Sequence, residues 1–248
     1  MQPGESSDQQ APPARPHRRY TGEGTRVREV LTYTRRGNTL GPRDQRAWDA
    51  HADAWVIPDG AVDDPEFDLA QHFGREAPLV VEIGSGVGEA TAPLAAARPD
   101  HNVLALEVWR PGVAAGLRRV ARAEVDNVRF CSVDAVWFLE QLVPEGGLAE
   151  LWTFFPDPWP KKRHHKRRLV SPRFAHLAAR RLGPGAAWRL ATDWGEYATW
   201  MQEVLDAEPL LEGGVVERWV ERPVTKFERK GVEAGRAITD LCYRRVRD

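Results

Sequence analysis

The sequence has few of the features that mark several large classes of protein. It has only two cysteines among 248 residues, Cys131 and Cys242, too few for a disulfide framework or a cysteine-rich metal site. No apolar run approaches the roughly 20 residues that a membrane-spanning helix needs. The first residues are polar and lack an apolar core, so we expect no secretory signal. These absences favour a soluble protein of the reducing cytoplasm, with no membrane partner.

The chain also lacks an excess of charge of either sign, because its formal net charge is −1. This balance excludes a polycation that would bind nucleic acid over its whole surface. Any nucleic-acid site must be a local basic patch that acids elsewhere balance. One such patch is present: six Lys or Arg residues fall among positions 161–168, directly after the sequence FFPDPWP (154–160).

The composition changes along the chain. Residues 1 to about 25 are rich in Pro, Gln, Ser, Gly and Arg and have little apolar surface to bury, which predicts a flexible segment. Aromatic residues between positions 26 and 57 indicate that the later part of this segment docks. We therefore expect residues 1–50 to form a flexible N-terminal arm, partly docked from about 26, and residues 51–248 to form one domain.

From residue 79 onward, short apolar runs alternate with amphipathic stretches. This alternation is typical of an α/β fold with a mostly parallel sheet and helices on both faces. Two further apolar runs near the C-terminus, with no long helix between them, are expected to form an antiparallel edge. The expected strands are 79–83, 103–107, 128–132, 148–155, 186–192, 214–220 and 238–246, and the expected helices are 89–97, 111–124, 134–142, 171–182 and 195–207.

The predicted helix at 171–182 has clear signals at both ends. Ser171 suits the N-cap and Pro172 the first turn. The sequence Gly183-Pro184-Gly185 is expected to end the helix, because glycine accepts the left-handed conformation and proline cannot continue a helix.

An acidic side chain stands at or just beyond the end of each of the first five predicted strands. In an open α/β sheet, ligands bind outside the carboxyl ends of the strands, so we expect these carboxylates to converge on one edge. A single acid there could instead cap a helix, and Asp134 fits a cap as well as it fits a ligand contact. Five such positions together favour a ligand site. The five acids are Glu82, Glu107, Asp134, Asp157 and Asp193.

The first predicted strand leads into a glycine-rich turn, Gly84-Ser85-Gly86-Val87-Gly88, which permits close approach of a ligand or serves as a plain structural turn. The third glycine comes one position earlier than in the dinucleotide fingerprint, and Glu89 occupies the fingerprint position. A carboxylate there is unfavourable beside a pyrophosphate. Glu107 suits the ribose hydroxyls of either NAD or S-adenosylmethionine. The many acids favour S-adenosylmethionine, because its sulfonium is cationic and it carries no phosphate.

The sequence FFPDPWP places one acid between two prolines. Their fixed backbone dihedral predicts that Asp157 is held in a rigid loop. Trp159 offers a face on which a base could stack, or it packs in the core. The cations at 161–168 would anchor phosphates without reading sequence. Alone, such a run could also be a solvated face or a localisation signal.

In these motifs the chain resembles the tRNA (guanine-N7-)-methyltransferases of the single-chain bacterial type, from about Arg28 onward. The resemblance implies a Rossmann-like class I methyltransferase fold, S-adenosylmethionine as donor, and a variable-loop guanine of tRNA, conventionally guanine 46, as acceptor. The chain departs at Trp109, where many members have His or Arg, and at Gly195, where others often have an acid. The motifs are EIGSGVGEAT (82–91), LEVWRPGV (106–113), FPDPWPKKRHHKRR (155–168), ATDW (191–194) and RPVTKFERKG (222–231).

The resemblance also implies roles for individual residues. Asp157 is implied as the catalytic residue. The implied cofactor-binding residues are Glu82, Gly84, Gly86, Glu107, Asp134 and Asp157. The implied substrate-binding residues are Lys161, Asp193, Thr225, Lys226, Phe227 and Glu228. The implied RNA-binding residues are Arg163, His164, His165, Lys166, Arg167 and Arg168. No metal is expected, since the two histidines have no third ligand at a suitable spacing.

Three other hypotheses remain. An NAD-dependent oxidoreductase would fit the first half of the chain. An amino-group methyltransferase would carry an Asp/Asn-Pro-Pro-aromatic loop, whereas this chain has Asp157-Pro158-Trp159. An RNA-binding module with a degenerate methyltransferase fold would keep the basic run without needing the acids. The sequence leaves open the oligomeric state, monomer or homodimer, the preferred tRNAs, and whether Asp157 or Asp193 contributes more to catalysis.

Overall fold

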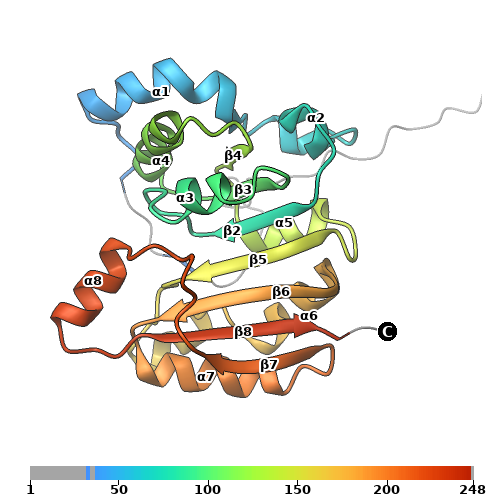
Figure 1. The fold of residues 1–248 in the computed structure, drawn as a ribbon, viewed down its shortest axis with the longest axis vertical. Helices are drawn as coiled ribbons and strands as arrows, with labels where there is room; N and C mark the ends of the chain where they lie inside the picture. The colour runs from blue at the N-terminus through green and yellow to red at the C-terminus, as the bar shows by residue number, and fades with distance from the viewer. Residues whose placement is uncertain (1–31, 34–36, 247–248) are drawn as a thin grey trace, which may run out of the picture.

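The computed structural model describes residues 32–33 and 37–246, so the predicted flexible segment at 1–25 lies outside the described residues. The centre of the structure is an eight-stranded sheet with the order β1-β4-β3-β2-β5-β6-β8-β7 (Figure 1). The β6–β8 and β7–β8 pairs are antiparallel and the other neighbouring pairs are parallel. The strands are β1 (Val56–Ile57), β2 (Leu79–Ile83), β3 (Asn102–Leu106), β4 (Val128–Cys131), β5 (Leu148–Phe154), β6 (Leu182–Thr192), β7 (Leu211–Val216) and β8 (Thr239–Arg245).

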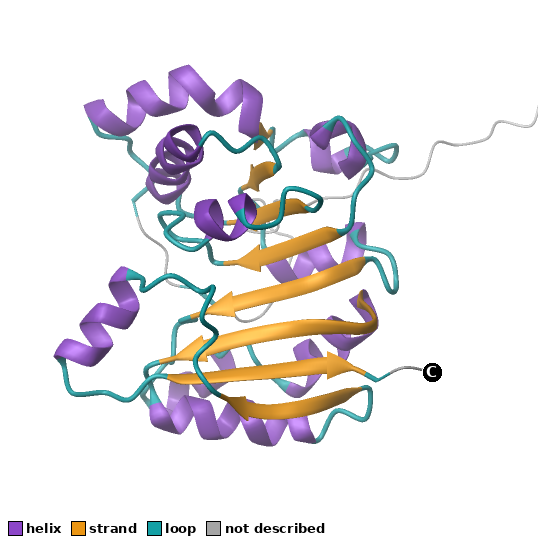
Figure 2. Ribbon diagram, in the orientation of Figure 1, coloured by secondary structure: helices purple, strands orange, loops and turns teal. Residues whose placement is uncertain are grey.

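Helices lie on both faces of this sheet (Figure 2). Helices α3 and α4 cover one face, with α1 packed outside α4, and α5, α6 and α7 cover the other. No helix among the described residues is both long and apolar enough to cross a membrane. The helices are α1 (Pro42–Trp55), α2 (Leu69–Phe73), α3 (Thr91–Ala96), α4 (Arg110–Ala123), α5 (Ala135–Leu142), α6 (Pro172–Arg181), α7 (Gly195–Asp206) and α8 (Lys226–Glu233), with 3₁₀ turns η1 (Ala61–Asp63) and η2 (Lys162–Arg167).

The continuous apolar runs of the central strands follow from this layering. In β2, Val80 packs in the core beneath α3 and α4, and Val81 packs in the core beneath α5 and α6. Val103 and Leu104 divide between the two cores in the same way on β3. Because both faces are buried, neither strand needs polar residues at alternate positions. The predicted α/β fold with an antiparallel C-terminal edge is confirmed.

The predicted end of the helix at 171–182 is partly wrong. Ser171 does cap α6, since its Oγ accepts a hydrogen bond from the backbone N–H of Phe174 at 3.4 Å. However, β6 begins at Leu182, so Gly183-Pro184-Gly185 belong to the strand. The β5–β6 register passes from Leu148↔Leu182 to Glu150↔Ala187. The three residues form the bulge that takes up the extra length.

The region after α7 also differs from the prediction. Strand β7 covers 211–216 rather than 214–220, and the eight-residue helix α8 lies between β7 and β8. Thr225 caps α8, because its Oγ1 accepts from the N–H of Glu228 at 3.3 Å. The spacing Thr225-x-x-Glu228 is a capping-box pattern, and this signal could have revealed the helix.

Helix α1 runs across the predicted boundary between residues 50 and 51. It packs on α4, where the Arg110 guanidinium lies 4.2 Å from the Trp48 ring centroid and Arg118 pairs with Asp44. The packed unit therefore includes residues 42–50.

Candidate active site

A cavity of about 400 Å³ lies at the carboxyl ends of β2, β3, β4 and β5. The loops that follow these strands form most of its wall, and the start of α8 completes it. Glu82, Glu107, Asp134 and Asp157 all line this cavity, whereas Asp193 is not part of its lining. The predicted convergence of acids on one sheet edge is therefore confirmed, because Asp193 also follows a parallel strand, β6, but only four of the five line the cavity.

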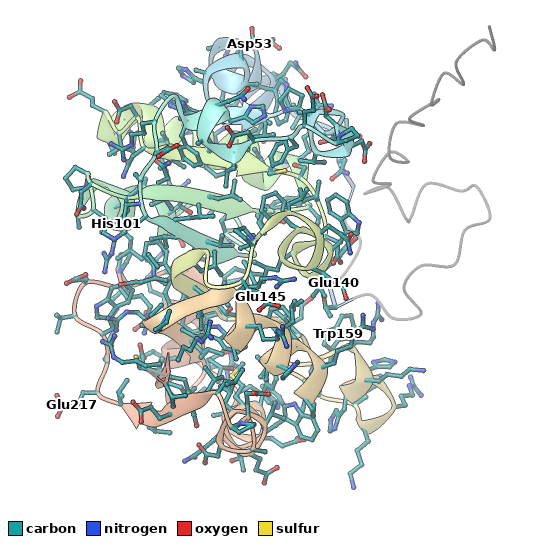
Figure 3. All side chains as sticks on the ribbon, turned by 90° about the vertical axis from the view of Figure 1, so that its right-hand side faces the viewer. Asp53, His101, Glu140, Glu145, Trp159 and Glu217 are labelled. Atoms are coloured by element: carbon teal, nitrogen blue, oxygen red, sulfur yellow. The ribbon has the colours of Figure 1, made fainter. Side chains whose placement is uncertain are left out.

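A second hollow, of about 650 Å³, lies against β6, β7 and β8. Its wall includes Arg189, Glu212, Glu217 and Arg244, but none of the acids from the strand ends. Figure 3 shows Glu217 on one side of the molecule and Trp159, at the end of the Asp157 loop, on the other. The two hollows are separate, and the acid-lined cavity is the candidate active site.

The glycine-rich turn forms one wall of this cavity. Gly84, Gly86 and Gly88 have φ angles of 72°, 58° and 74°, in the left-handed region that favours glycine. A Cβ on Gly88 would lie 2.8 Å from the Cα of Gly116 in α4. The third glycine therefore lets the turn pack directly against a helix, although it stands one position earlier than in the dinucleotide fingerprint.

Glu107 joins this turn to the loop after β3. Its Oε2 accepts a hydrogen bond from the N–H of Gly86 at 2.7 Å, and its Oε1 accepts one from the N–H of Trp109 at 2.8 Å. Each carboxylate oxygen can accept more than one hydrogen bond. The position on the cavity wall is therefore compatible with the predicted contact to ribose hydroxyls.

Glu82 is buried on β2, and its Oε2 accepts a hydrogen bond from the Thr91 hydroxyl at 2.6 Å. Burial raises the pKa of Glu82 to about 7, although the Thr91 hydrogen bond favours the ionised form. The negative charge of Glu107 contributes a smaller part of this rise in the pKa. Glu82 therefore changes its charge near neutral pH.

We expect Glu82→Gln to stabilise the ligand-free protein more at pH 8 than at pH 5. Because the folded-state pKa lies above the usual value of 4.5, the folded protein binds more protons than the unfolded chain between about pH 4.5 and 7. The stability that protonated Glu82 contributes is complete below pH 4.5 and is lost as the pH rises through 7. The total loss of folding free energy between these two pH values is on the order of 3 kcal/mol. Thermal unfolding at both pH values measures it, and an equal effect of the substitution at both would contradict the expectation.

Asp134 caps helix α5 and lines the cavity as well. Its Oδ1 accepts hydrogen bonds from the N–H groups of Val136 and Trp137, both at 3.0 Å. The helix-cap alternative is therefore confirmed. It does not exclude a ligand contact, because the same carboxylate lies in the cavity wall.

The loop around Asp157 has an unusual backbone. Phe155 and Trp159 have φ angles of 51° and 45°, which are uncommon for bulky residues and store strain. The N–H of Phe155 donates to the carbonyl of Ala191 at 2.7 Å, and Arg168 Nε donates to the carbonyl of Pro158 at 2.9 Å. These bonds hold both sides of Asp157, as the prediction of a rigid loop requires.

Trp159 packs at the surface rather than in the core. The guanidinium of Arg167 lies 3.8 Å from its ring centroid, the ring of His164 meets it edge-on, and its indole N–H donates to the carbonyl of Thr32 at 3.1 Å. One face of the indole is therefore already occupied by a cation, which leaves less of it for a stacked base.

The basic run does not form a uniform surface. Lys161, Lys162, Arg163 and Lys166 are exposed, and most of the run is the 3₁₀ turn η2. Arg168 is only 3% exposed; besides its bond to Pro158 it donates to Glu196 Oε1 at 3.1 Å and stacks on Tyr197. Arg168 therefore faces inward, where its side chain holds the Asp157 loop, and its role in RNA binding stays a prediction.

The residues implied as the substrate site divide into two groups. Thr225, Lys226 and Phe227 line the cavity, and Phe227 is 49% exposed at its mouth. Asp193 lies outside the cavity lining and pairs with Arg236, with an Nη2–Oδ2 distance of 2.8 Å. Glu228 is buried and also outside the lining.

Glu228 belongs to a buried ion-pair network that the sequence analysis missed. Arg222, which is fully buried, donates to Glu228 at 2.5 Å and to both carboxylate oxygens of Asp240 at 3.1 and 2.9 Å. Arg218 donates to Glu228 at 2.8 Å. Burial alone would raise the pKa of Glu228, but the two arginines hold this pKa below its usual value. The network fixes α8 to β8.

Within residues 32–33 and 37–246, no group of three or more His, Cys, Asp or Glu side chains is placed to hold a metal ion. The cavity acids instead accept hydrogen bonds from backbone N–H and hydroxyl groups. The arrangement suits a ligand that carries positive charge and hydroxyl groups.

Comparisons with known proteins agree with this arrangement. Residues 76–241 match the family model described as "Putative methyltransferase". The chain is 67% identical over 233 residues to a tRNA (guanine-N(7)-)-methyltransferase of Nocardioides sp., covering 94% of each chain. It is 47% identical to one of Cutibacterium acnes, covering 90% of this chain and 86% of that one.

A comparison of folds finds the 16S rRNA methyltransferase KamB, with a TM-score of 0.51 and 18% identity over 73% of this chain and 95% of that one. At that identity the likeness shows the fold alone. The sequence identity to the two bacterial relatives shows the family, because the alignments cover 86–94% of the chains compared. The chain therefore belongs to the tRNA (guanine-N(7)-)-methyltransferase family.

Proposed function

We propose that the protein transfers a methyl group from S-adenosylmethionine to N7 of a variable-loop guanine of tRNA, conventionally guanine 46, in the cytoplasm. The observation that carries this proposal is the cavity in which four carboxylates meet beside an exposed basic run. The Nocardioides relative, which matches along 94% of both chains, is named a tRNA (guanine-N(7)-)-methyltransferase, and this name supports the tRNA and the N7 atom of the proposal.

The cavity fits S-adenosylmethionine in size and charge. Its volume of about 400 Å³ is within the range of sites for small ligands. The glycine-rich turn lets a ligand approach the backbone. Glu107 and Asp134 place negative charge beside it, to which Glu82 adds when it is ionised. These residues would hold the cofactor, which supplies an electrophilic methyl group on a sulfonium. The same charges, with Glu89 in the cavity wall, disfavour a pyrophosphate and therefore NAD.

The proposed reaction requires little proton transfer by the protein. Guanine N7 has a free lone pair, so the N–C bond can form while the C–S bond breaks and its electron pair moves to sulfur. The protein has to align the acceptor with the methyl carbon and stabilise the positive charge that develops on the guanine. Asp157 can do both if its carboxylate accepts hydrogen bonds from guanine N1–H and the exocyclic amine.

The neighbouring residues complete this arrangement. Asp193 pairs with Arg236 outside the cavity lining, which favours Asp157 as the main catalytic carboxylate. Lys161 follows the Asp157 loop and is exposed, so it can bind a phosphate next to the target. Phe227 can pack against a base at the cavity mouth.

Radiolabelled methyl transfer to unmodified tRNA, followed by mapping of the methylated atom, tests the proposed function. We expect label at N7 of guanine 46 and its loss when adenine replaces that guanine. Label on an exocyclic amine would instead indicate an amino-group methyltransferase. Binding of tRNA without any transfer would indicate the RNA-binding module.

Replacing two exposed cations of the basic run is expected to weaken tRNA binding and to make this binding less dependent on salt. For Arg163→Gln with Lys166→Gln, the plot of the logarithm of the tRNA association constant against the logarithm of the salt concentration should become less steep. The magnitude of its slope should decrease by about 2, or about 1 for each lost phosphate contact. The matched control is Arg173→Gln with Arg180→Gln, on the exposed side of α6. An equal change of slope in both doubles would exclude the run as the RNA site.

A further inference from the structure

Helix α8 is attached to the rest of the domain at both ends and in the middle. It lies beyond the carboxyl ends of the parallel strands (Figure 1). Glu228 fixes its middle through the buried arginines. Near its end, Gly231 packs so closely that a Cβ there would lie 2.7 Å from the Cβ of Asp193. The first turn of α8 differs from the rest of the helix, because its partner is a residue of the cavity wall.

Glu89 makes that attachment. Its Oε2 accepts a hydrogen bond from the backbone N–H of Lys226 at 2.5 Å, and its Oε1 accepts one from Arg229 at 3.2 Å. The N–H of Lys226 is one of the first in the helix and has no acceptor within it. A carboxylate at a helix N-terminus is also favoured by the helix dipole.

The other side of Glu89 is continuous with the glycine-rich turn. Arg119 of α4 donates to the carbonyl of Val87 at 3.1 Å, and its Nη2 lies 3.7 Å from Glu89 Oε1. The N–H of Gly86, one residue earlier, is bound by Glu107. Residues 86–89 thus connect the glycine-rich wall of the cavity to the N-terminus of α8, which lines the same cavity. In the dinucleotide fingerprint a glycine would stand at position 89, and no such link could form.

We infer that Glu89 is a positioning residue that couples cofactor binding to tRNA binding. The inference rests on the proposed function, because it takes tRNA as the ligand of the Thr225–Phe227 segment. A cofactor bound on the glycine-rich turn would contact residues 86–89, which Glu89 ties to the N-terminus of α8. Each ligand would then favour the arrangement of this segment that the other ligand binds, which is positive coupling between two sites.

The test is a set of binding titrations on the full chain. The affinity for tRNA is measured with and without saturating S-adenosylhomocysteine, and the affinity for S-adenosylhomocysteine is measured alone. We expect the wild type to bind tRNA at least about fivefold more tightly when S-adenosylhomocysteine is present. In Glu89→Ala this ratio should fall to less than about twofold, whatever the change in the affinity for S-adenosylhomocysteine alone, because Glu89 also lines the cavity.

Three further variants locate the effect. Glu89→Gln retains an acceptor for the Lys226 N–H and should keep part of the coupling. Arg229→Ala should reduce the coupling and add little to Glu89→Ala, because the two side chains are in contact. Glu233→Ala removes an acid from the exposed last turn of the same helix and should leave the ratio unchanged.

Each opposite outcome has its own meaning. Unchanged coupling in Glu89→Ala, or no coupling in the wild type, would overturn the inference alone. Weaker binding of S-adenosylhomocysteine with intact coupling would make Glu89 a cofactor ligand and would also overturn it. A wild-type chain that binds S-adenosylhomocysteine but no tRNA would overturn the proposed function, and the inference with it.

Discussion

Asp157→Ala is expected to fold and to lose methyl transfer to tRNA by about 10²–10³-fold, the usual effect of removing one stabilising group. The variant should fold because other contacts hold the loop. These are the bond from Phe155 to Ala191 and the bond from Arg168 to Pro158. The loss should occur in the chemical step, because the carboxylate that offsets charge on the guanine is gone. Single-turnover methyl transfer at saturating tRNA measures that step directly.

Two comparisons make this result specific. Asp157→Asn keeps the size of the side chain and one acceptor oxygen, so it should lie between wild type and Asp157→Ala if charge matters. Asp193→Asn should have a smaller effect on the rate, since Asp193 is paired with Arg236 outside the cavity lining. Turnover of Asp157→Ala within a few-fold of wild type would show that Asp157 is not the catalytic carboxylate.

Arg222→Met is expected to lower the free energy of unfolding by about 3–5 kcal/mol, because it leaves two carboxylates buried without their shared partner. Glu228 and Asp240 are both nearly inaccessible and both accept hydrogen bonds from Arg222. The same variant should bind tRNA poorly even where it is folded, since α8 loses its attachment to β8. Urea unfolding and tRNA titration at low temperature measure the two effects separately.

Arg218→Met is the matched control for Arg222→Met. Arg218 contacts the same Glu228, but its side chain is partly exposed and it leaves the Arg222 pairs in place. We expect this substitution to lower the free energy of unfolding by at most about 1 kcal/mol, as for other exposed pairs. Equal losses of stability in the two variants would mean that burial does not determine how much an ion pair of this network stabilises the fold.

The sequence predicted the parts of the fold that depend on local pattern. Strand β2 was predicted with the bounds 79–83 that the structure has, because both of its faces are buried and its apolar run is continuous. The cavity acids followed from the same reasoning, since each stands at the end of such a strand. Helix α1 was not predicted, because Ala47 is its one buried residue and its other apolar contacts, from Trp48, Ala52 and Trp55, are only partly buried.

The side-chain contacts that the sequence did not predict at the candidate site have a common physical cause. Arg168 and Lys166 are equivalent in a basic run, but of the two only Arg168 contacts Glu196, which is 28 residues away in helix α7. Glu228 belongs to a motif that the resemblance places in the substrate site, yet Arg222 and Asp240 draw it into the interior. Long-range pairing determines which charges face a ligand, and local sequence does not encode it.

The strand order has a consequence for how the protein is completed during synthesis. Strand β8 lies between β6 and β7, so β7 has no partner in the sheet until residues 239–245 have left the ribosome. A domain generally folds as a unit, and the start of α8, just before β8, completes the wall of the acid-lined cavity. The cavity is therefore finished only when the last strand of the chain has been made.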